Sequence, residues 1–351
     1  MADSTPIELT AGEPVEAQRY PVSRRTTMLV DHARGGRLLG VEIWCPTITE
    51  SPERTSYELF PGVAFQSAGS QHGAAVRPGP WPLVLFSHGR TGVRIAYSLA
   101  CEALAARGAI VVSADHPGDA LVDWLLGTHT DDATNESNRI ADAHLVLEAV
   151  LTGSEHVDSD IAVAIDRERI AIAGHSYGAY TALATASGDR GVAAHPAVSA
   201  VIGFQPYTRT MSDELLRRLD VPALLVVASE DTTTPPDTNA DRPWEIIGRD
   251  ATVAAPLWRL DLAGASHQAI SDISLYAEMV DHVPGLPDIV RTYLASQLPP
   301  PDDTPSRHWR DRIRVQVSAA WSFLEAVWGS APQGAAPADL AAETDLRFKF
   351  R

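Results

Sequence analysis

Residues 169–186, RIAIAGHSYGAYTALATA, join a short apolar run to an alanine-rich run through the pattern Gly174-x-Ser176-x-Gly178. A G-x-S-x-G motif between a buried strand and a helix forms a sharp turn that lifts the serine hydroxyl above the sheet. Its glycines let neighbouring backbone approach closely, and the new helix points its first amides at the reacting centre. The stretch therefore predicts a strand at 170–173, a helix opening at Ser176, and Ser176 as a nucleophile.

Short apolar runs alternate with helical segments on both sides of this motif. The alternation predicts a parallel sheet wrapped by right-handed crossovers. The predicted strands are 83–87, 109–113, 170–173, 200–204, 221–228 and 257–262, and the main predicted helices are 95–107, 140–151, 176 onward and about 309–328.

Earlier in the chain, residues 26–30 and 39–44 are typical of an antiparallel hairpin at the edge of a sheet, and residues 50–80 look irregular.

We expect the α/β class and the α/β-hydrolase fold, with a mostly parallel central sheet of about eight strands, an antiparallel N-terminal hairpin and helices on both faces. Residues 1–24 would be a polar N-terminal segment. Residues 25–329 would form one catalytic domain with small lid insertions and extra C-terminal helices, which a Pro-rich break at 297–304 interrupts. Residues 330–351 would form a loosely packed tail.

Composition excludes several classes of protein. A 351-residue chain that is 45% hydrophobic and 21% charged is an ordinary globular sequence. The net charge of −17 argues against nucleic-acid binding, which needs clustered Lys and Arg. The two cysteines, Cys45 and Cys101, fit neither a disulfide framework nor a metal-ligand spacing. We find no secretory signal and no run long enough to span a membrane, so we expect a cytoplasmic protein. The triad chemistry predicted below requires no metal or organic cofactor.

A second motif follows the strand 83–87. Ser87-His88-Gly89-Arg90-Thr91-Gly92 occupies the place of the loop that supplies an oxyanion donor in this fold. We assign the backbone N–H groups of Arg90 and Tyr177 as donors, with Thr91 as the alternate to Arg90. We interpret the His88 side chain as a structural group that hydrogen-bonds the backbone.

His267 is the predicted general base. It lies in a loop of small residues, LAGASHQAISD, directly after the predicted strand 257–262. His195, His282 and His308 also come after Ser176, but none of them follows a strand.

Asp231 is the predicted acid that orients His267. It follows the strand 221–228 and precedes Pro235-Pro236, which stiffens the loop. Glu230 is chemically competent, but adjacent residues point in different directions. We interpret Asp189 as a solvated turn residue and Asp115 as part of a pocket wall.

Three pocket residues are also predicted. Loops 115–118 and 205–207 leave their strands at the same edge of the sheet, where ligands bind in open α/β sheets, so His116 and Gln205 should border the site. Residues 122–126 could form an apolar lid wall around Trp124, or could belong to the core.

Four segments resemble platelet-activating factor acetylhydrolases and bacterial dienelactone hydrolase-like proteins. They are residues 26–47, 86–120, 174–183 (GHSYGAYTAL) and 264–272 (GASHQAISD). The resemblance covers roughly residues 25–275 and implies an esterase or lipase-type hydrolase that uses Ser176 and His267, with oxyanion donors at Arg90 and Tyr177. Two departures matter. The segment after strand 200–204 lacks the acid found there in the platelet-activating factor enzymes, and a serine stands where dienelactone hydrolases have cysteine.

Together these features predict a serine carboxylic-ester hydrolase. It would act through a Ser-His-Asp triad and an acyl-enzyme on a small-molecule ester with a small or medium acyl group. Alternatives are a lipase or polyester hydrolase with an open cleft, an amidase or acyltransferase with the same triad, and a non-catalytic binding module. The oligomeric state is left open, with a homodimer among the options.

Overall fold

The computed structural model of the protein describes residues 9–10, 14–50, 53–60, 63–154, 156–249, 255–280, 283, 285–296, 307–329 and 334–351. The predicted Pro-rich break at residues 297–304 lies outside them. Within this part of the chain, no helix is both long and apolar enough to cross a membrane.

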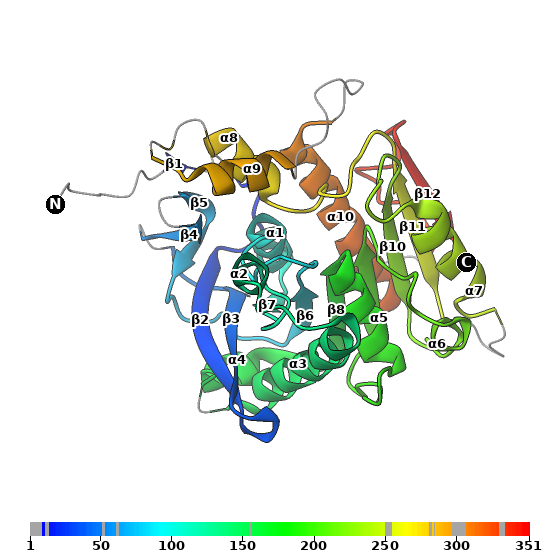
Figure 1. Cartoon of the computed structure of the whole chain (residues 1–351), viewed down its shortest axis with the longest axis horizontal. Helices are drawn as coiled ribbons and strands as arrows, with labels where there is room; N and C mark the ends of the chain where they lie inside the picture. The colour runs from blue at the N-terminus through cyan, green and yellow to red at the C-terminus, as the bar shows by residue number, and fades with distance from the viewer. Residues whose placement is uncertain are drawn as a thin grey trace.

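One mixed sheet runs through the molecule (Figure 1). Its central strands are parallel, in the spatial order β7-β6-β8-β9-β10-β11. These strands are β6 (Trp81–Ser87), β7 (Ile110–Ala114), β8 (Ile165–His175), β9 (Ala200–Phe204), β10 (Ala223–Ala228) and β11 (Leu257–Leu262). The predicted parallel sheet of an α/β-hydrolase fold is therefore confirmed.

The N-terminal hairpin is present but does not form the edge of the sheet. β2 (Val22–Asp31) and β3 (Arg37–Pro46) pair antiparallel, and β3 then pairs antiparallel with β7. On the other side, β2 pairs with β5 (Val63–His72), which also pairs with β1 (Leu9–Thr10) and β4 (Arg54–Phe60).

The sheet has 12 strands over the described residues, more than the predicted eight. Much of the difference lies in residues 54–72, which the sequence pattern presents as irregular. β5 carries small polar residues that are nevertheless buried, because Ser67 and Ser70 both donate hydrogen bonds to the buried Glu102 carboxylate. A polar strand that is buried through long-range hydrogen bonds shows no hydrophobic alternation.

Helices cover both faces of the sheet, as predicted. Alternate strand residues divide between two cores: Val84 and Phe86 of β6 face one, and Leu83 and Leu85 face the other. The first core is covered by α1 (Ser98–Arg107), α8 (Ile273–Val280), α9 (Asp288–Ser296) and α10 (Trp309–Val327). The second is covered by α3 (Asp132–Thr152), α4 (Ser159–Ala164), α5 (Tyr177–Ser187) and α6 (Asp213–Arg217). The shorter elements are α2 (Leu121–Leu126), α7 (Arg242–Ile246), η1 (His32–Arg34) and η2 (Asp237–Asp241).

The C-terminal residues are part of the sheet, contrary to the predicted loose tail. β12 (Leu346–Phe350) pairs antiparallel with β11 and lies beside it in Figure 1. The Phe350 ring packs edge-on against Trp258 at a centroid distance of 4.9 Å. At the other end of the chain, residues 14–24 also pack against the domain: Val15 is buried, and Glu16 accepts two hydrogen bonds from Arg107.

Asp272 holds the start of α1 against the start of α8. Its backbone N–H donates to the Ala96 carbonyl at 2.9 Å, and its carboxylate accepts from the Ser98 hydroxyl at 2.6 Å and more weakly from the Leu99 N–H at 3.3 Å. Burial raises the pKa of Asp272 to about 7, more than the hydrogen bonds from Ser98 and Leu99 lower it.

The pKa shift of Asp272 predicts a pH-dependent stability. Since the folded protein favours the protonated carboxyl, the stability that this carboxyl contributes is complete below its unfolded pKa of about 4 and is lost as pH rises through about 7. Asp272→Asn keeps an acceptor but cannot ionise. Between pH 5 and 8, the free energy of unfolding of the wild type should fall relative to that of Asp272→Asn, by on the order of a few kcal/mol. Urea unfolding of both proteins checks this, and parallel stability curves would contradict it.

Candidate active site

Ser176 lies in a strained turn between β8 and α5. Its φ is 55° and its ψ is −119°, a conformation that L-residues rarely adopt and that persists only where the surroundings enforce it. The Ser176 N–H donates to the Phe204 carbonyl at 2.9 Å, and its own carbonyl accepts from the Tyr207 N–H at 3.0 Å. Both partners hold the turn at the carboxyl end of β9.

The two motif glycines permit this turn. A Cβ atom on Gly174 would lie 2.2 Å from the Gly178 carbonyl oxygen, and one on Gly178 would lie 2.0 Å from the Ser87 carbonyl oxygen. Neither position can carry a side chain without moving backbone. The first turn of α5 therefore packs directly on the end of β6, where the loop 87–92 begins.

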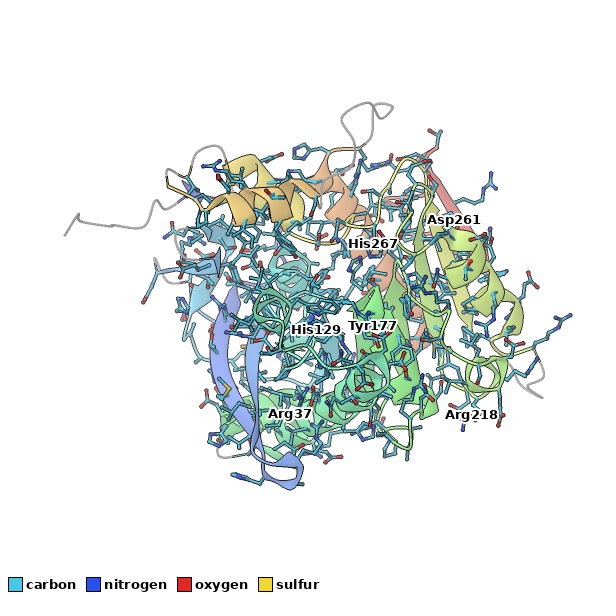
Figure 2. The ribbon with its side chains drawn as sticks, viewed as in Figure 1. Arg37, His129, Tyr177, Arg218, Asp261 and His267 are labelled. Atoms are coloured by element: carbon cyan, nitrogen blue, oxygen red, sulfur yellow. The ribbon has the colours of Figure 1, made fainter. Side chains whose placement is uncertain are left out.

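The structure brings Ser176, His267 and Asp231 into one hydrogen-bonded line. His267 Nε2 lies 2.9 Å from Ser176 Oγ, and His267 Nδ1 lies 2.7 Å from Asp231 Oδ2. The residues come from the carboxyl ends of β8, β11 and β10, which meet at one edge of the sheet. Figure 2 shows His267 and Tyr177, the neighbour of Ser176, in the middle of the molecule. If Nδ1 donates to the carboxylate, Nε2 is left to accept the Ser176 proton.

The Asp231 carboxylate is held by its own loop. Oδ1 accepts from the N–H groups of Thr233 and Thr234, and Oδ2 accepts from the Thr234 hydroxyl at 2.7 Å. Burial alone would raise the pKa of Asp231, but the hydrogen bond to His267, the charge of His267 and the Thr234 hydrogen bonds together lower it. Asp231 is therefore an ionised partner for His267. Glu230, its neighbour in sequence, is exposed.

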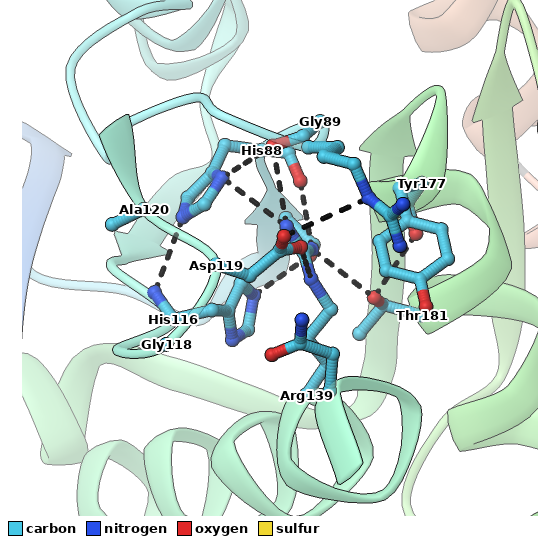
Figure 3. Close-up of polar contacts among 12 residues, drawn as sticks. His88, Gly89, His116, Gly118, Asp119, Ala120, Arg139, Tyr177 and Thr181 are labelled. Atoms are coloured by element: carbon cyan, nitrogen blue, oxygen red, sulfur yellow. Dashed lines mark hydrogen bonds and ion pairs between the residues drawn. The ribbon is translucent and has the colours of Figure 1, made fainter. Parts of the chain in front are cut away.

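The buried Arg139 of α3 lies beneath the loop 87–92 (Figure 3). Its guanidinium donates to the carbonyls of His88 at 2.8 Å and Gly89 at 3.2 Å, and to Asp119 Oδ2 at 2.8 Å. It also lies 5.0 Å from the centroid of the Tyr177 ring. One cation therefore contacts both segments that carry the predicted oxyanion donors.

His88 performs the predicted structural role. Its Nε2 accepts from the His116 N–H at 3.1 Å, so its proton is on Nδ1, which donates to the Gly89 carbonyl at 2.7 Å. Burial, with Arg139 and His116 nearby, lowers the pKa of His88 well below its usual range, so the ring stays neutral.

Three donors fix the Gly89–Arg90 peptide. The Gly89 carbonyl accepts from His88 Nδ1, from Arg139 and from the Gly92 N–H at 3.0 Å. In a planar trans peptide the N–H points opposite to the C=O, so the Arg90 N–H is directed away from Arg139. The amide of Thr91, the alternate donor, instead donates to the Asp119 carbonyl at 3.2 Å.

His175, the variable residue between Gly174 and Ser176, links two loops. The Tyr97 hydroxyl donates to His175 Nδ1 at 2.8 Å and accepts from the Gly89 N–H at 3.2 Å. His175 Nε2 donates to the His267 carbonyl at 2.7 Å. Burial and the charge of His267 lower the pKa of His175 to about 3, so the ring is neutral and keeps this pattern. Sequence reasoning missed Tyr97, His175 and Arg139, because their partners lie far away in the chain.

A cavity of about 50 Å³ opens beside Ser176. Loop 89–92, α8 and α9 enclose it together with the Ser176 and His267 segments. The lining residues are Gly89, Arg90, Thr91, Gly92, Ala96, Tyr97, His175, Ser176, His267, Gln268, Ser271, Ile273 and Tyr293.

The three predicted pocket residues do not line this cavity. His116 is buried under the loop, 2.9 Å from Ser87 Oγ and 3.1 Å from Asp142. The Gln205 side chain points into the core and donates to Gln316 on α10. Trp124 stacks on His129 with a ring-centroid distance of 4.0 Å. Their loops do leave the expected edge of the sheet, but these side chains contact other residues and do not reach the cavity. In the described part of the chain, no cluster of three His, Cys, Asp or Glu side chains could hold a metal ion.

The packing of Gly178 predicts a large effect of a single methyl group. Gly178→Ala should lower the free energy of unfolding by more than about 3 kcal/mol, because the new Cβ collides with the backbone of Ser87. Gly127→Ala is the control: Gly127, unlike Gly178, has a positive φ that strains any Cβ, but nothing lies within 4 Å of that Cβ. It should cost only about 1–2 kcal/mol. Urea unfolding compares the two, and equal losses would show that the close contact is not what matters.

The comparisons with known proteins agree with this architecture. Residues 74–226 match the family model described as Chlorophyllase. No curated protein sequence matches the chain. Among solved structures, a ferulic acid esterase from Streptomyces cinnamoneus is similar at 24% identity and a TM-score of 0.72, over 96% of this chain and 99% of that chain. The sheet and this likeness show that the chain has the α/β-hydrolase fold, with a chlorophyllase-like segment at residues 74–226.

Proposed function

We propose that this protein is a serine ester hydrolase that cleaves small-molecule esters of short acyl groups. The observation that carries the proposal is the line Ser176 Oγ, His267 Nε2, His267 Nδ1, Asp231 Oδ2, joined by contacts of 2.9 and 2.7 Å. That order of nucleophile, base and acid, each at hydrogen-bond distance, is what acyl transfer through a serine requires.

The reaction would proceed in two steps. His267 takes the Ser176 proton as Oγ attacks the ester carbonyl, and it then gives that proton to the departing alcohol. Water, activated by the same imidazole, attacks the acyl-enzyme and releases the acid. Asp231 stays ionised and stabilises the imidazolium that forms in each step. His267 carries the proton transfers in both steps, and the backbone amides only donate hydrogen bonds to the oxyanion.

Two amides would stabilise the oxyanion. The N–H of Tyr177 begins α5 beside Ser176, and the N–H of Arg90 is directed away from the anchored Gly89 carbonyl. A Cβ on Gly89 would lie 3.3 Å from the Ser176 Cβ, so the loop that carries the Arg90 amide passes directly beside the nucleophile. Donors of this kind contribute about 3–4 kcal/mol each to stabilising the transition state.

The cavity favours a short acyl group. Because one water needs about 10–15 Å³, a cavity of about 50 Å³ accommodates a group of only a few heavy atoms. This size argues against an open-cleft lipase or polyester hydrolase. Ester cleavage, rather than amide cleavage or acyl transfer, is favoured by the chlorophyllase match, the ferulic acid esterase likeness and the acetylhydrolase-like segments around Ser176 and His267.

Replacement of the nucleophile tests the proposal directly. The wild type should hydrolyse p-nitrophenyl acetate, and Ser176→Ala should lose at least about 10³-fold in kcat because no acyl-enzyme can form. Ser187→Ala, at the other end of α5, removes a buried hydroxyl that has no hydrogen-bond partner in the described structure, and should retain activity. Comparable rates in wild type and Ser176→Ala would overturn the proposal.

Adjacent carboxylates test the role of the acid. Asp231→Asn should lower kcat by about 10⁴-fold, because an amide favours the wrong imidazole tautomer and cannot stabilise the imidazolium. The matched control is Glu230→Gln, which changes an exposed neighbour and should leave kcat within about twofold. Steady-state kinetics on p-nitrophenyl acetate measures both. A larger loss in Glu230→Gln would reassign the acid.

A further inference from the structure

A second, smaller cavity lies behind the wall of the first. Its volume is about 20 Å³, and it is lined by Leu59, Thr91, Gly92, Val93, Ala96, Leu121, Ile273, Tyr276 and Tyr293. Five of these residues also line the cavity beside Ser176: Thr91, Gly92, Ala96, Ile273 and Tyr293. The two cavities are therefore separated by a shared wall, and the rear cavity is almost wholly apolar.

The rear cavity lies on one side of the reacting centre. It shares the loop residues Thr91 and Gly92 with the first cavity, but neither Ser176 nor His267 lines it. In the proposed mechanism the alcohol leaves beside His267, which must protonate it. A group that extends along the loop wall, away from His267, therefore belongs to the acyl half of an ester.

Tyr293 is the largest side chain in the shared wall. It projects from α9, the helix whose Val290 and Leu294 pack into the core. Its hydroxyl hydrogen-bonds the Thr91 side chain, and burial raises the pKa of that hydroxyl, so it stays protonated. Thr91 is fixed in turn, with a φ of 60° and its N–H on the Asp119 carbonyl. The other shared residues are smaller, and Gly92 and Ala96 could open little space if they were changed.

We propose that Tyr293 is the specificity-determining residue that limits the acyl chain, by closing the apolar rear cavity off from the cavity beside Ser176. The inference rests on the proposed esterase function. The wild type takes short acyl groups, up to butyryl, and loss of the Tyr293 ring joins the two cavities into one apolar acyl pocket.

The test is a series of p-nitrophenyl esters from acetate to octanoate. In the wild type, kcat/KM should fall steeply beyond butyrate. In Tyr293→Ala, the ratio of kcat/KM for hexanoate to that for acetate should rise by at least tenfold, because each newly buried methylene contributes about fourfold. Tyr293→Phe keeps the ring and should keep the wild-type profile. Ile289→Ala, an exposed position on the same helix, is the matched control and should also keep it.

Two further measurements test the role of Tyr293 independently of Tyr293→Ala and of the acyl series. Tyr293→Trp enlarges the wall and should reduce turnover of propionate and butyrate relative to acetate, so a test remains if Tyr293→Ala does not fold. A series of alkyl acetates with growing alcohol groups should show the same profile in wild type and Tyr293→Ala. A change on the alcohol side alone would overturn the assignment of the acyl side.

The outcomes separate this inference from the proposed function. If wild-type turnover depends on Ser176 but all Tyr293 variants share one chain-length profile, the Tyr293 inference is wrong and the esterase stands. If the wild type has no Ser176-dependent turnover of any ester, the proposed function fails and the inference fails with it.

Discussion

The contact between Gly178 and the Ser87 carbonyl is the constraint on which the site depends. Because a Cβ there would lie 2.0 Å from that oxygen, the start of α5 rests on the end of β6 with no side chain between them. This closeness places Ser176 beside the loop 87–92, in a turn where its φ is 55°. Strain of this kind costs about 1–3 kcal/mol and persists only where surrounding packing enforces it. Here the buried second half of β8, residues 170–175, and the fully buried helix α5 provide that packing.

Buried charge then fixes the loop that faces Ser176. Arg139 and Asp119 form an ion pair whose side chains are 1% and 0% exposed. The other Arg139 nitrogens donate to the His88 and Gly89 carbonyls of the loop, and more weakly to the Ser87 and Thr181 hydroxyls. A buried pair of this kind adds little net stability, because desolvation offsets its attraction, but removal of either partner leaves an uncompensated charge and costs about 3–5 kcal/mol. The pair therefore specifies the conformation of the loop more than it stabilises the fold. Rigid donors are what transition-state stabilisation needs, since they do not have to reorganise during the reaction.

The features predicted from sequence are those that depend on neighbouring residues. The turn at Ser176 needs only glycines two positions away on either side, and the parallel strands need only short apolar runs, so both could be predicted. His267 and Asp231 could be predicted because each lies in the loop that follows a strand, at the carboxyl edge of the sheet. Arg139 could not: its carbonyl partners are 50 and 51 residues away, and nothing in the helical pattern of α3 marks it. β5 and β12 were missed for a related reason, since a polar strand and a terminal strand become part of the sheet only through their pairing partners.

The two loops that face Ser176 are also linked to each other. The chain from the Gly89 N–H through Tyr97 and His175 to the His267 carbonyl joins the loop 87–92 to the loop that carries His267. Its middle member is the variable residue of the motif itself, so one turn of backbone positions both the hydroxyl and the base. A histidine suits this place because a neutral imidazole accepts at one nitrogen and donates at the other. Burial lowers the pKa of His175 and so keeps the ring neutral. This neutrality matters because a protonated ring could no longer accept the hydrogen bond from Tyr97. The geometry around Ser176 therefore does not depend on the ionisation of His175 over the pH range in which His267 must act as a base.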